Sequence, residues 1–270
     1  MTNLQSNLLK TLCFLCAMAL SIREITAQNN ENERVLMAIF AHPDDEMTVA
    51  PILAKYVDEG VKVYLVICTD GRYGTNDFTD HEAGEGLVAI RKEEMKCAAE
   101  KLGVSLIHLD YHDQLRAGEG YDGHVPHARK MTLELEEIIS EKKPDALITW
   151  GPDGGSTHMD HRLVGASVTQ VFVSKLWEKT KKLYYVGTPS HLMEDEERKK
   201  LAGVDATLMN RRIKYGEIDI KKAMESLQCH TSQVSPEMVE WRQAYNQKSN
   251  NTIYFREFVG PSEIAETLFD

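Results

Sequence analysis

The chain has 270 residues, of which 42% are hydrophobic and 27% are charged, an ordinary composition for a globular protein. Its formal net charge of -11 argues against nucleic acid or an anionic membrane as a partner, because both are bound through a basic surface. A chain of this length forms one large domain or two small ones.

The first residues have the pattern of a secretory signal peptide. Residues 11–22 (TLCFLCAMALSI) form an apolar run after a leader that has Lys10 and no acid, and Ala27 is a small residue at a suitable cleavage point. The run is too short to span a membrane stably. We expect a signal peptide over residues 1–27, a single domain over 28–270, a secreted or periplasmic location and no membrane insertion after cleavage. A buried N-terminal helix and a lipoprotein attached at Cys16 are the less favoured alternatives.

Apolar strand patterns then alternate with helical patterns along the chain, while the stretch from about 190 to 270 is polar and less regular. The expected strands are 34–41, 61–69, 104–111, 145–150 and 181–186, and the expected helices are 46–60, 87–104, 127–144 and 158–179. Such alternation predicts an α/β fold, a doubly wound and mostly parallel sheet with helices on both faces. Ligands of these sheets bind beyond the carboxyl ends of the strands. The loops 70–86 and 112–126 are long enough to form a mobile rim around such a site.

Three cysteines remain once the leader is removed. Cys68, Cys97 and Cys229 are odd in number and scattered, so we expect no disulfide framework. Cys68 ends an expected strand and Cys97 lies in an expected helix, which is typical of small buried apolar residues.

The stretch AHPDDE, residues 41–46, follows the first expected strand directly. His42 and Asp45 are side chains that bind Zn²⁺ or another divalent metal. Because adjacent side chains point in different directions, Asp45 can bind a metal while Asp44 faces a water molecule beside it. The alternative is a charged turn in which Asp44 or Asp45 caps the next helix.

A second cluster, WGPDGGSTHMDHR at 150–162, follows the expected strand 145–150. His158 and His161 are three residues apart and share one face of a first helical turn. His161 would join the two ligands from the first cluster across the sheet edge, which leaves a fourth metal position open for water, as in catalytic zinc sites. Asp160 also fits a capping box with Thr157, so it could serve the helix end instead.

The pair of motifs AHPDDE and HMDH resembles the LmbE-like, or PIG-L, family of metal-dependent de-N-acetylases. The resemblance covers about 34–235 and includes the supporting stretches TDGRYGT at 69–75 and HTSQ at 230–233. It implies a Rossmann-like fold, hydrolysis of a linear amide, and zinc at the carboxyl edge of the sheet, with Fe²⁺ or another divalent metal as the alternative.

The family pattern also implies a role for each matching residue. Asp44 would be the general base, His158 would stabilise the oxyanion or help to protonate the leaving amine, and Asp160 would orient a neighbouring histidine. Arg91 and Asp113 match substrate-binding residues. The metal ligands implied by the pattern are His42, Asp45 and His161.

Two further residues are candidates for substrate contact because of where they lie in the sequence. Arg72 in DGRYG either contacts a substrate or is a loop charge, and His230 either closes the pocket together with Gln233 or lies on a helix surface. The sequence departs from the family at Met159, where proline is usual, and at Ser156, where the mycothiol-pathway enzymes have tyrosine.

These patterns predict a zinc-dependent deacetylase that acts on a small molecule or glycan containing an N-acetylated amino sugar of the GlcNAc type. The alternatives are an amidase for another N-acyl compound, such as a thiol conjugate, and a non-catalytic carbohydrate-binding protein with a degenerate site. The G-x-S-x-G motif of serine hydrolases does not occur in the sequence, which disfavours nucleophilic acyl transfer.

Overall fold

The computed structural model describes residues 33–115, 126–156, 158–260 and 267. The chain divides into two compact units, Met1–Arg34 and Val35–Asp270, and the second holds every element described below. The expected signal peptide lies outside the described residues. Within those residues, none of the helices has the length and apolar character needed to cross a membrane.

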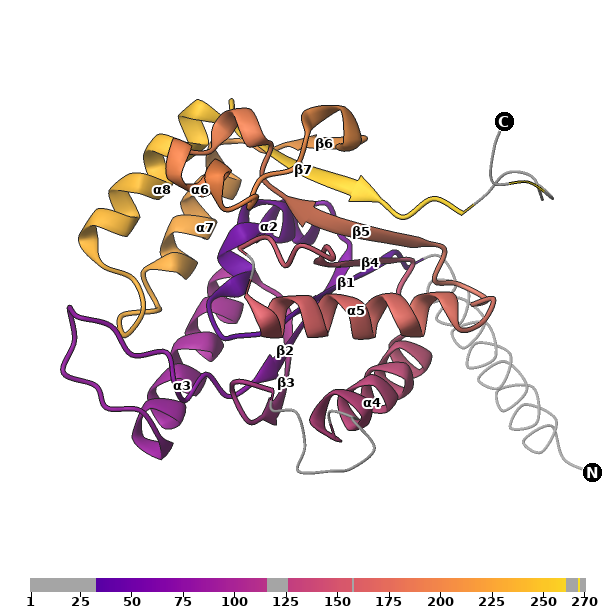
Figure 1. Ribbon diagram of the computed structural model, residues 1–270, viewed down its shortest axis with the longest axis horizontal. Coiled ribbons are helices and arrows are strands. Elements are labelled where there is room, and N and C mark those ends of the chain that lie inside the picture. Colours follow the sequence, from indigo (N-terminus) through magenta and orange to yellow (C-terminus); the bar gives the residue numbers. More distant parts are fainter. Residues whose placement is uncertain (1–32, 116–125, 157, 261–266, 268–270) are drawn as a thin grey trace, which may run out of the picture. The chain divides into compact units, whose positions relative to one another are not determined.

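A seven-stranded sheet runs through the unit in the order β3-β2-β1-β4-β5-β7-β6 (Figure 1). The first five strands in this order pair in parallel, and β7 and β6 continue the sheet as antiparallel strands. The predicted α/β sheet, mostly parallel, is confirmed. The strands are β1 (Val35–Phe40), β2 (Lys62–Thr69), β3 (Ser105–Tyr111), β4 (Ala146–Trp150), β5 (Lys182–Gly187), β6 (Arg211–Lys214) and β7 (Thr252–Glu257).

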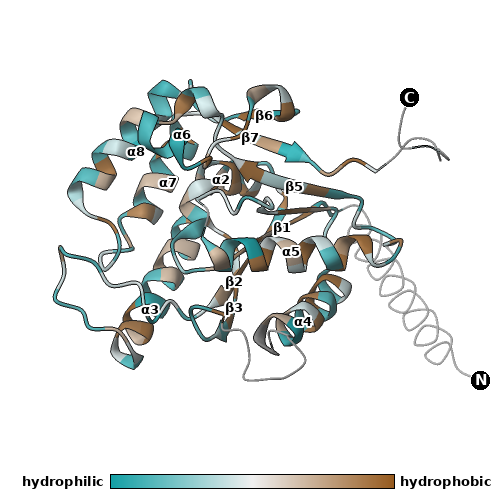
Figure 2. Cartoon of the chain, viewed as in Figure 1, coloured by the Kyte–Doolittle hydropathy of each residue, from teal (hydrophilic) through white to brown (hydrophobic). Residues whose placement is uncertain are grey.

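Helices cover both faces of the sheet. Alternate residues of β1 point to opposite faces, so Leu36 and Phe40 pack with α2, α3 and α7, while Met37 and Ile39 pack with α4 and α5. The central strands are accordingly apolar, whereas α6 and α8 are mostly polar (Figure 2). The helices and 3-10 turns are η1 (Asp45–Thr48), α2 (Ala50–Asp58), α3 (Glu85–Leu102), α4 (Pro126–Lys142), α5 (Met159–Val173), η2 (Ser190–Leu192), α6 (Asp195–Lys199), η3 (Ala206–Leu208), α7 (Glu217–Leu227) and α8 (Pro236–Lys248).

The region after residue 190 is more ordered than its sequence pattern indicates. It supplies α7, α8 and the two antiparallel strands that extend the sheet beyond β5. Its strand β6 reads RRIK and is the last in the sheet, and charged side chains are usual on an edge strand that solvent reaches. Helix α8 is polar on most of its surface. Neither β6 nor α8 therefore shows the regular spacing of apolar residues from which a strand or helix is predicted.

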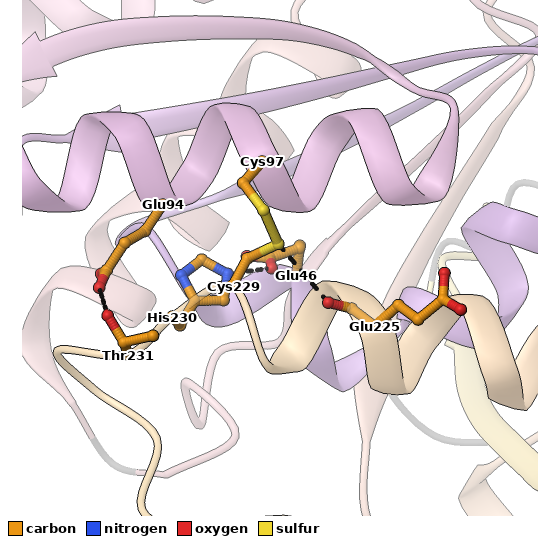
Figure 3. The surroundings of a disulfide bond; sticks show 7 residues. All are labelled: Glu46, Glu94, Cys97, Glu225, Cys229, His230 and Thr231. Carbon is orange, nitrogen blue, oxygen red and sulfur yellow. Dashed lines mark hydrogen bonds and ion pairs between the residues drawn. A yellow bond between two sulfur atoms is a disulfide. The ribbon is translucent and has the colours of Figure 1, made fainter.

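One disulfide bond corrects the expectation drawn from the cysteines. Cys97 on α3 and Cys229 just after α7 are bonded, with their Cα atoms 5.8 Å apart (Figure 3). The two residues are 132 positions apart in the sequence, so only the packing of α3 against α7 reveals the pair. Cys68 is a free, buried residue, as expected.

Candidate functional site

The two histidine-containing clusters meet because their strands are neighbours. β1 pairs in parallel with β4, so the chain leaves both strands at the same edge of the sheet. His42 follows β1 by two residues, and the loop after β4 leads to α5, on which His161 lies in the first turn. The predicted convergence of the two motifs at the carboxyl edge is therefore what the topology produces.

The three predicted metal ligands bring their donor atoms together. His42 Nδ1 lies 3.2 Å from His161 Nε2. Asp45 Oδ1 lies 3.1 Å from His161 Nε2, and Asp45 Oδ2 lies 3.8 Å from His42 Nδ1. Ligand atoms bound at about 2.0 to 2.1 Å to one tetrahedral zinc ion lie about 3.3 Å from each other, so the two contacts of His161 Nε2 have the spacing of ligands that share one cation.

The outer hydrogen bonds of both histidines indicate which ring nitrogens have lone pairs. His161 Nδ1 donates to the carbonyl oxygen of Gly154 at 2.9 Å, which leaves Nε2 unprotonated in the neutral ring. His42 Nε2 lies 3.2 Å from Asp113 Oδ1 and 3.3 Å from Asp160 Oδ2, so its proton is on that side. The lone pairs of His42 Nδ1 and His161 Nε2 then face each other beside a carboxylate oxygen. Such an arrangement is repulsive without a positive charge between the atoms, and this donor set fits a divalent metal.

Asp45 is fixed so that one of its oxygens is free for this role. Its Oδ2 accepts hydrogen bonds from the backbone N–H groups of Ala41 and His42, both at 3.0 Å, and from Trp150 Nε1 at 3.2 Å. Oδ1 is the oxygen that faces His161. The ring of Trp150 also stacks on the His161 ring, with centroids 4.4 Å apart. Trp150 therefore holds both predicted ligands, a role that its position at the end of a buried strand did not reveal.

The electrostatics of the cluster favour a positive charge at its centre. Burial alone would lower the pKa of His42, but hydrogen bonds from the ring to Asp113, Asp160 and Asp45 outweigh it and raise that pKa well above 6.5. Burial alone would raise the pKa of Asp45, but His161 and His42 hold it well below its usual range. The carboxylates around the His42 ring thus stabilise a positive charge at this place.

Asp44 occupies a strained position beside these ligands. Its φ angle is 119°, a value that residues other than glycine rarely adopt. Arg91 Nη2 lies 2.9 Å from Asp44 Oδ2, and the same guanidinium donates to the carbonyl oxygens of Pro43 and Gly71. Burial raises the pKa of Asp44 to about 6, although the Arg91 charge works in the opposite direction. A carboxylate with this pKa is suited to accept a proton near neutral pH.

Arg91 is buried among backbone atoms instead of lying open to solvent. The φ of Gly71 is 68°, and a Cβ built on it would lie 2.6 Å from Arg91 Nη1, so glycine there lets the guanidinium approach. The contacts of Arg91 in the structure support the Pro43–Asp44 turn. Its contact with a substrate stays a prediction.

His158 lies next to the three predicted ligands and is exposed. Ligand atoms of His42, His158 and His161 lie within 4.8 Å of one another. The ring of His158 caps α5, since its Nδ1 accepts a hydrogen bond from the backbone N–H of Asp160 at 3.2 Å. The neutral ring therefore has its proton on Nε2. Burial and the neighbouring charges of His42 and His161 lower the pKa of His158, which favours this neutral form.

Asp160 and Asp113 both lie behind His42 and are buried. Asp160 Oδ1 accepts the backbone N–H of Leu115 at 3.0 Å, while its Oδ2 faces the His42 ring. Asp113 Oδ2 accepts the backbone N–H of Tyr73 at 3.0 Å. Burial would raise the pKa of Asp113, but the hydrogen bond with His42 outweighs it, and the pKa is below its usual range. Both carboxylates orient His42 here, and a substrate contact by Asp113 stays a prediction.

The two remaining candidate residues for substrate contact, Arg72 and His230, each interact with carboxylates of the protein. Arg72 forms ion pairs with Asp70 at 2.5 Å and with Glu85 at 3.0 Å. The ring of His230 has no exposed surface, and its Nε2 lies 2.7 Å from Glu46 Oε1. Substrate contacts by Arg72 and His230 stay predictions, and in this structure each side chain has a partner within the protein.

A second polar cluster, mostly buried, adjoins the first through the neighbours Asp45 and Glu46, and we call it the support cluster; Figure 3 draws its members other than Ser232. Its members are Glu46, Glu94, His230, Thr231 and Ser232. Glu94 accepts hydrogen bonds from Thr231 Oγ1 at 2.8 Å, the Ser232 backbone N–H at 2.7 Å and Ser232 Oγ at 2.6 Å. Glu46 Oε2 accepts the backbone N–H of Asp44 at 3.1 Å. The cluster thus links α3 and the end of α7 to the turn that carries Asp44.

A cavity of about 680 Å³ opens beside the candidate ligands. Asp44, Asp45 and His161 line it, together with Trp150, the end of β5 and one side of α8. Gln233, from the stretch HTSQ, also lines it. A substrate that enters this cavity meets the predicted base and two of the predicted ligands.

Comparisons with known proteins identify the family of this chain. The family model described as PIG-L: GlcNAc-PI de-N-acetylase matches residues 37–172, which include both motifs. A 1D-myo-inositol 2-acetamido-2-deoxy-alpha-D-glucopyranoside deacetylase of Corynebacterium glutamicum (strain R) is 34% identical over 140 residues, which are 47% of this chain and 48% of that protein. A probable N-acetyl-alpha-D-glucosaminyl L-malate deacetylase 2 of Bacillus cereus is 31% identical over 191 residues, covering 70% of this chain and 74% of that protein. The chain thus spans about half the length of the first relative.

The fold has a known counterpart among solved structures. The N,N'-diacetylchitobiose deacetylase from Pyrococcus horikoshii superimposes with a TM-score of 0.64 over 84% of this chain and 85% of that chain, at 21% sequence identity. At this identity the likeness concerns the fold, and it confirms the predicted Rossmann-like architecture. The family follows from the sequence match over residues 37–172, and the chain belongs to the PIG-L, or LmbE-like, family.

Proposed function

We propose that this protein is an exported, zinc-dependent hydrolase that removes the N-acetyl group from an amino sugar of the GlcNAc type, giving a free amine and acetate. The observation that carries the proposal is that His42 Nδ1 and Asp45 Oδ1 both lie close to His161 Nε2, at the edge of a cavity lined by Asp44, Asp45 and His161. The relatives support it, because both are named as deacetylases, one of an acetamido-glucopyranoside and one of a glucosaminyl malate.

The donor set supports zinc as the metal. Two imidazoles and one carboxylate are the kind of ligands that catalytic zinc sites use, with a further position left open. When bound, the ion supplies Lewis-acid activation of water and of the acetyl carbonyl. Trp150, Asp113 and Asp160 keep the ligands oriented toward it through the hydrogen bonds described above.

Asp44 and His158 supply the proton and charge chemistry. Asp44 lines the cavity and takes the proton of the attacking water as oxygen bonds to the acetyl carbon. His158 donates a hydrogen bond from Nε2–H to the carbonyl oxygen as negative charge develops there, and it keeps its proton. The carbon–nitrogen bond then breaks, and the leaving nitrogen receives the proton that Asp44 accepted.

Two features support export. Residues 1–27 have the pattern of a signal peptide, and the Cys97–Cys229 disulfide suits an oxidising compartment such as the periplasm or the exterior of the cell. We infer that residues 28–270 act there as a single domain.

The test is acetate release from a panel of N-acetyl sugars by the zinc-loaded protein and by Asp44→Asn. Asparagine has the size of aspartate and tolerates positive φ, so the variant should fold and retain zinc. Its rate should fall by roughly 100- to 10,000-fold. If no N-acyl compound releases acetate, the proposed hydrolase activity is wrong. If only compounds other than sugars release acetate, the result favours the alternative, an amidase for another N-acyl compound. A fully active Asp44→Asn protein would overturn the proposed base.

A further inference from the structure

The cavity extends beyond the candidate metal ligands to residues of α8 and α6. Asp44, Asp45 and His161 line it, and so do α8 and the first residues of α6 with the turn before it. At about 680 Å³ it lies within the range of roughly 300 to 1,000 Å³ that takes drug-sized ligands, and a single acetylated pyranose is smaller than such a ligand. The α8 side of the cavity therefore has room for a further part of the substrate.

Two aromatic rings on α8 face this room. Trp241 lines the cavity and is 51% exposed. Its ring stacks on Tyr245 with centroids 5.4 Å apart and an angle of 25° between the planes. The broad apolar C–H face of a pyranose packs on such rings, whereas its hydroxyls bond to polar groups around them. An exposed tryptophan in a cavity next to a predicted catalytic base thus indicates ligand contact.

Arg242 supplies hydrogen-bond donors beside the rings. Its Cζ lies 5.2 Å from the centre of the Trp241 ring and 5.8 Å from that of Tyr245, and it lines the same cavity. Among the described residues, no carboxylate forms an ion pair with Arg242. Its N–H groups are therefore available to a ligand.

The other charges of this wall favour a neutral ligand over an anion. Lys248 and Glu194 form an ion pair at 2.8 Å, and Glu197 adds a carboxylate to the cavity lining. The positive charge of Arg242 is thus balanced within the cavity wall. Arginine and glutamate side chains around an aromatic platform suit the hydroxyl groups of a sugar.

We propose that α8 forms a second subsite, made by Trp241, Tyr245 and Arg242, for a pyranose linked to the acetylated sugar. The substrate is then an oligosaccharide of at least two units. This inference rests on the proposed function, because the subsite continues the cavity in which the N-acetyl group would react.

The test compares two substrates in the zinc-loaded protein, N-acetylglucosamine and N,N'-diacetylchitobiose. In Trp241→Ala the ratio of kcat/KM for the disaccharide to that for the monosaccharide should fall about tenfold, mainly through KM, as loss of an aromatic contact of about 1.4 kcal/mol would give. Trp241→Phe, which keeps a ring, should recover part of that ratio. Phe78→Ala removes an exposed aromatic residue outside the cavity and should leave the ratio as in wild type.

Binding without turnover separates this inference from the proposed activity. Calorimetric titration of Asp44→Asn with diacetylchitobiose should give a Kd about tenfold lower than titration of the Asp44→Asn/Trp241→Ala protein. This result supports the subsite even if no sugar releases acetate, which would overturn the proposed function alone. Equal ratios and equal Kd values with and without Trp241 overturn the subsite. It is also overturned if Trp241→Ala and Arg242→Met weaken binding of N-acetylglucosamine 1-phosphate but leave diacetylchitobiose binding unchanged, because the wall would then bind an anion.

Discussion

Asp45 and Glu46 are neighbours in the sequence, yet they belong to two buried clusters of opposite character. Asp45 faces His161 and His42 in a group whose ring lone pairs point at one another. Glu46 faces the N–H of Asp44 and the ring of His230, and in the same support cluster Glu94 accepts three hydrogen bonds. In the first cluster two ring nitrogens face each other beside a carboxylate oxygen, whereas the hydrogen-bonded carboxylates of the second already have their donors.

Neighbouring residues of the two clusters should therefore contribute to different properties, one to metal binding and turnover and the other to stability. A substitution in the metal-ligand cluster should change metal binding and turnover while the fold remains, because the sheet edge is held by other contacts. A substitution in the support cluster should lower the free energy of unfolding, because it leaves buried donors or acceptors without partners.

The largest effect is expected from His161→Ala. Loss of a hydrogen-bond partner of a metal ligand weakens metal binding by up to about 100-fold. Loss of one of the three ligands themselves should therefore weaken zinc binding by more than about 100-fold, and acetate release should fall to background. Competition with a chelator measures the affinity, and circular dichroism should show an unchanged fold. His191→Ala, an exposed histidine in η2, is the matched control. Zinc affinity equal to that of wild type would disprove the ligand set.

The Cys97–Cys229 bond, which joins α3 to the chain just after α7 beside the support cluster, should have the largest effect on the free energy of unfolding. Removing both cysteines as Cys97→Ala/Cys229→Ala should lower the free energy of unfolding by about 2 to 4 kcal/mol, because the bond closes a long loop in the unfolded chain. Zinc affinity should stay the same. A reductant should destabilise wild type by a similar amount and leave the double variant unaffected, as urea titrations would show. Two free thiols in the native, oxidised protein would contradict the bond.

The sheet and the metal-ligand cluster could be predicted because their signals are local. Buried strands such as Val35–Phe40 are apolar throughout, and each histidine-containing motif follows directly on such a strand. Parallel strands end at the same edge, so two motifs over 100 residues apart could be expected to meet. The family resemblance assigned separate expected roles to the adjacent acids, because each acid has its own position in the motif.

The support cluster could not be predicted, because its pairs depend on how helices pack. Glu94 and Ser232 are 138 residues apart, and neither has an unusual sequence context. The sequence indicated only that Trp150 ends a strand. Trp241 lies on a helix in which apolar residues show no regular spacing that would mark a buried face. Packing of α3 against α7, and the path of the chain beyond β5, decide these contacts.

Within the support cluster, neighbouring glutamates give a matched pair of variants. Glu94→Gln replaces one acceptor oxygen with an N–H₂ group that faces the donors of Thr231 and Ser232, so the free energy of unfolding should fall by about 1 to 3 kcal/mol. Glu93→Gln changes an exposed side chain that pairs with Lys96, and its effect should stay within about 0.5 kcal/mol. Urea titration measures both. Equal effects would show that the carboxylate of Glu94 is not needed by its neighbours.

The smallest effect concerns the pH dependence of the same cluster. Burial would lower the pKa of His230, but the charge of Glu46 and its hydrogen bond outweigh this and raise the pKa above 6.5. The stability that the protonated ring contributes is fully present below the unfolded pKa of 6.5 and is lost as pH rises through the higher folded pKa. As pH rises above about 6.5, the free energy of unfolding should therefore fall more steeply in wild type than in His230→Gln. The same slope in both proteins would mean that Glu46 is held by a neutral imidazole, whose hydrogen bond alone would then link α7 to the Asp44 turn.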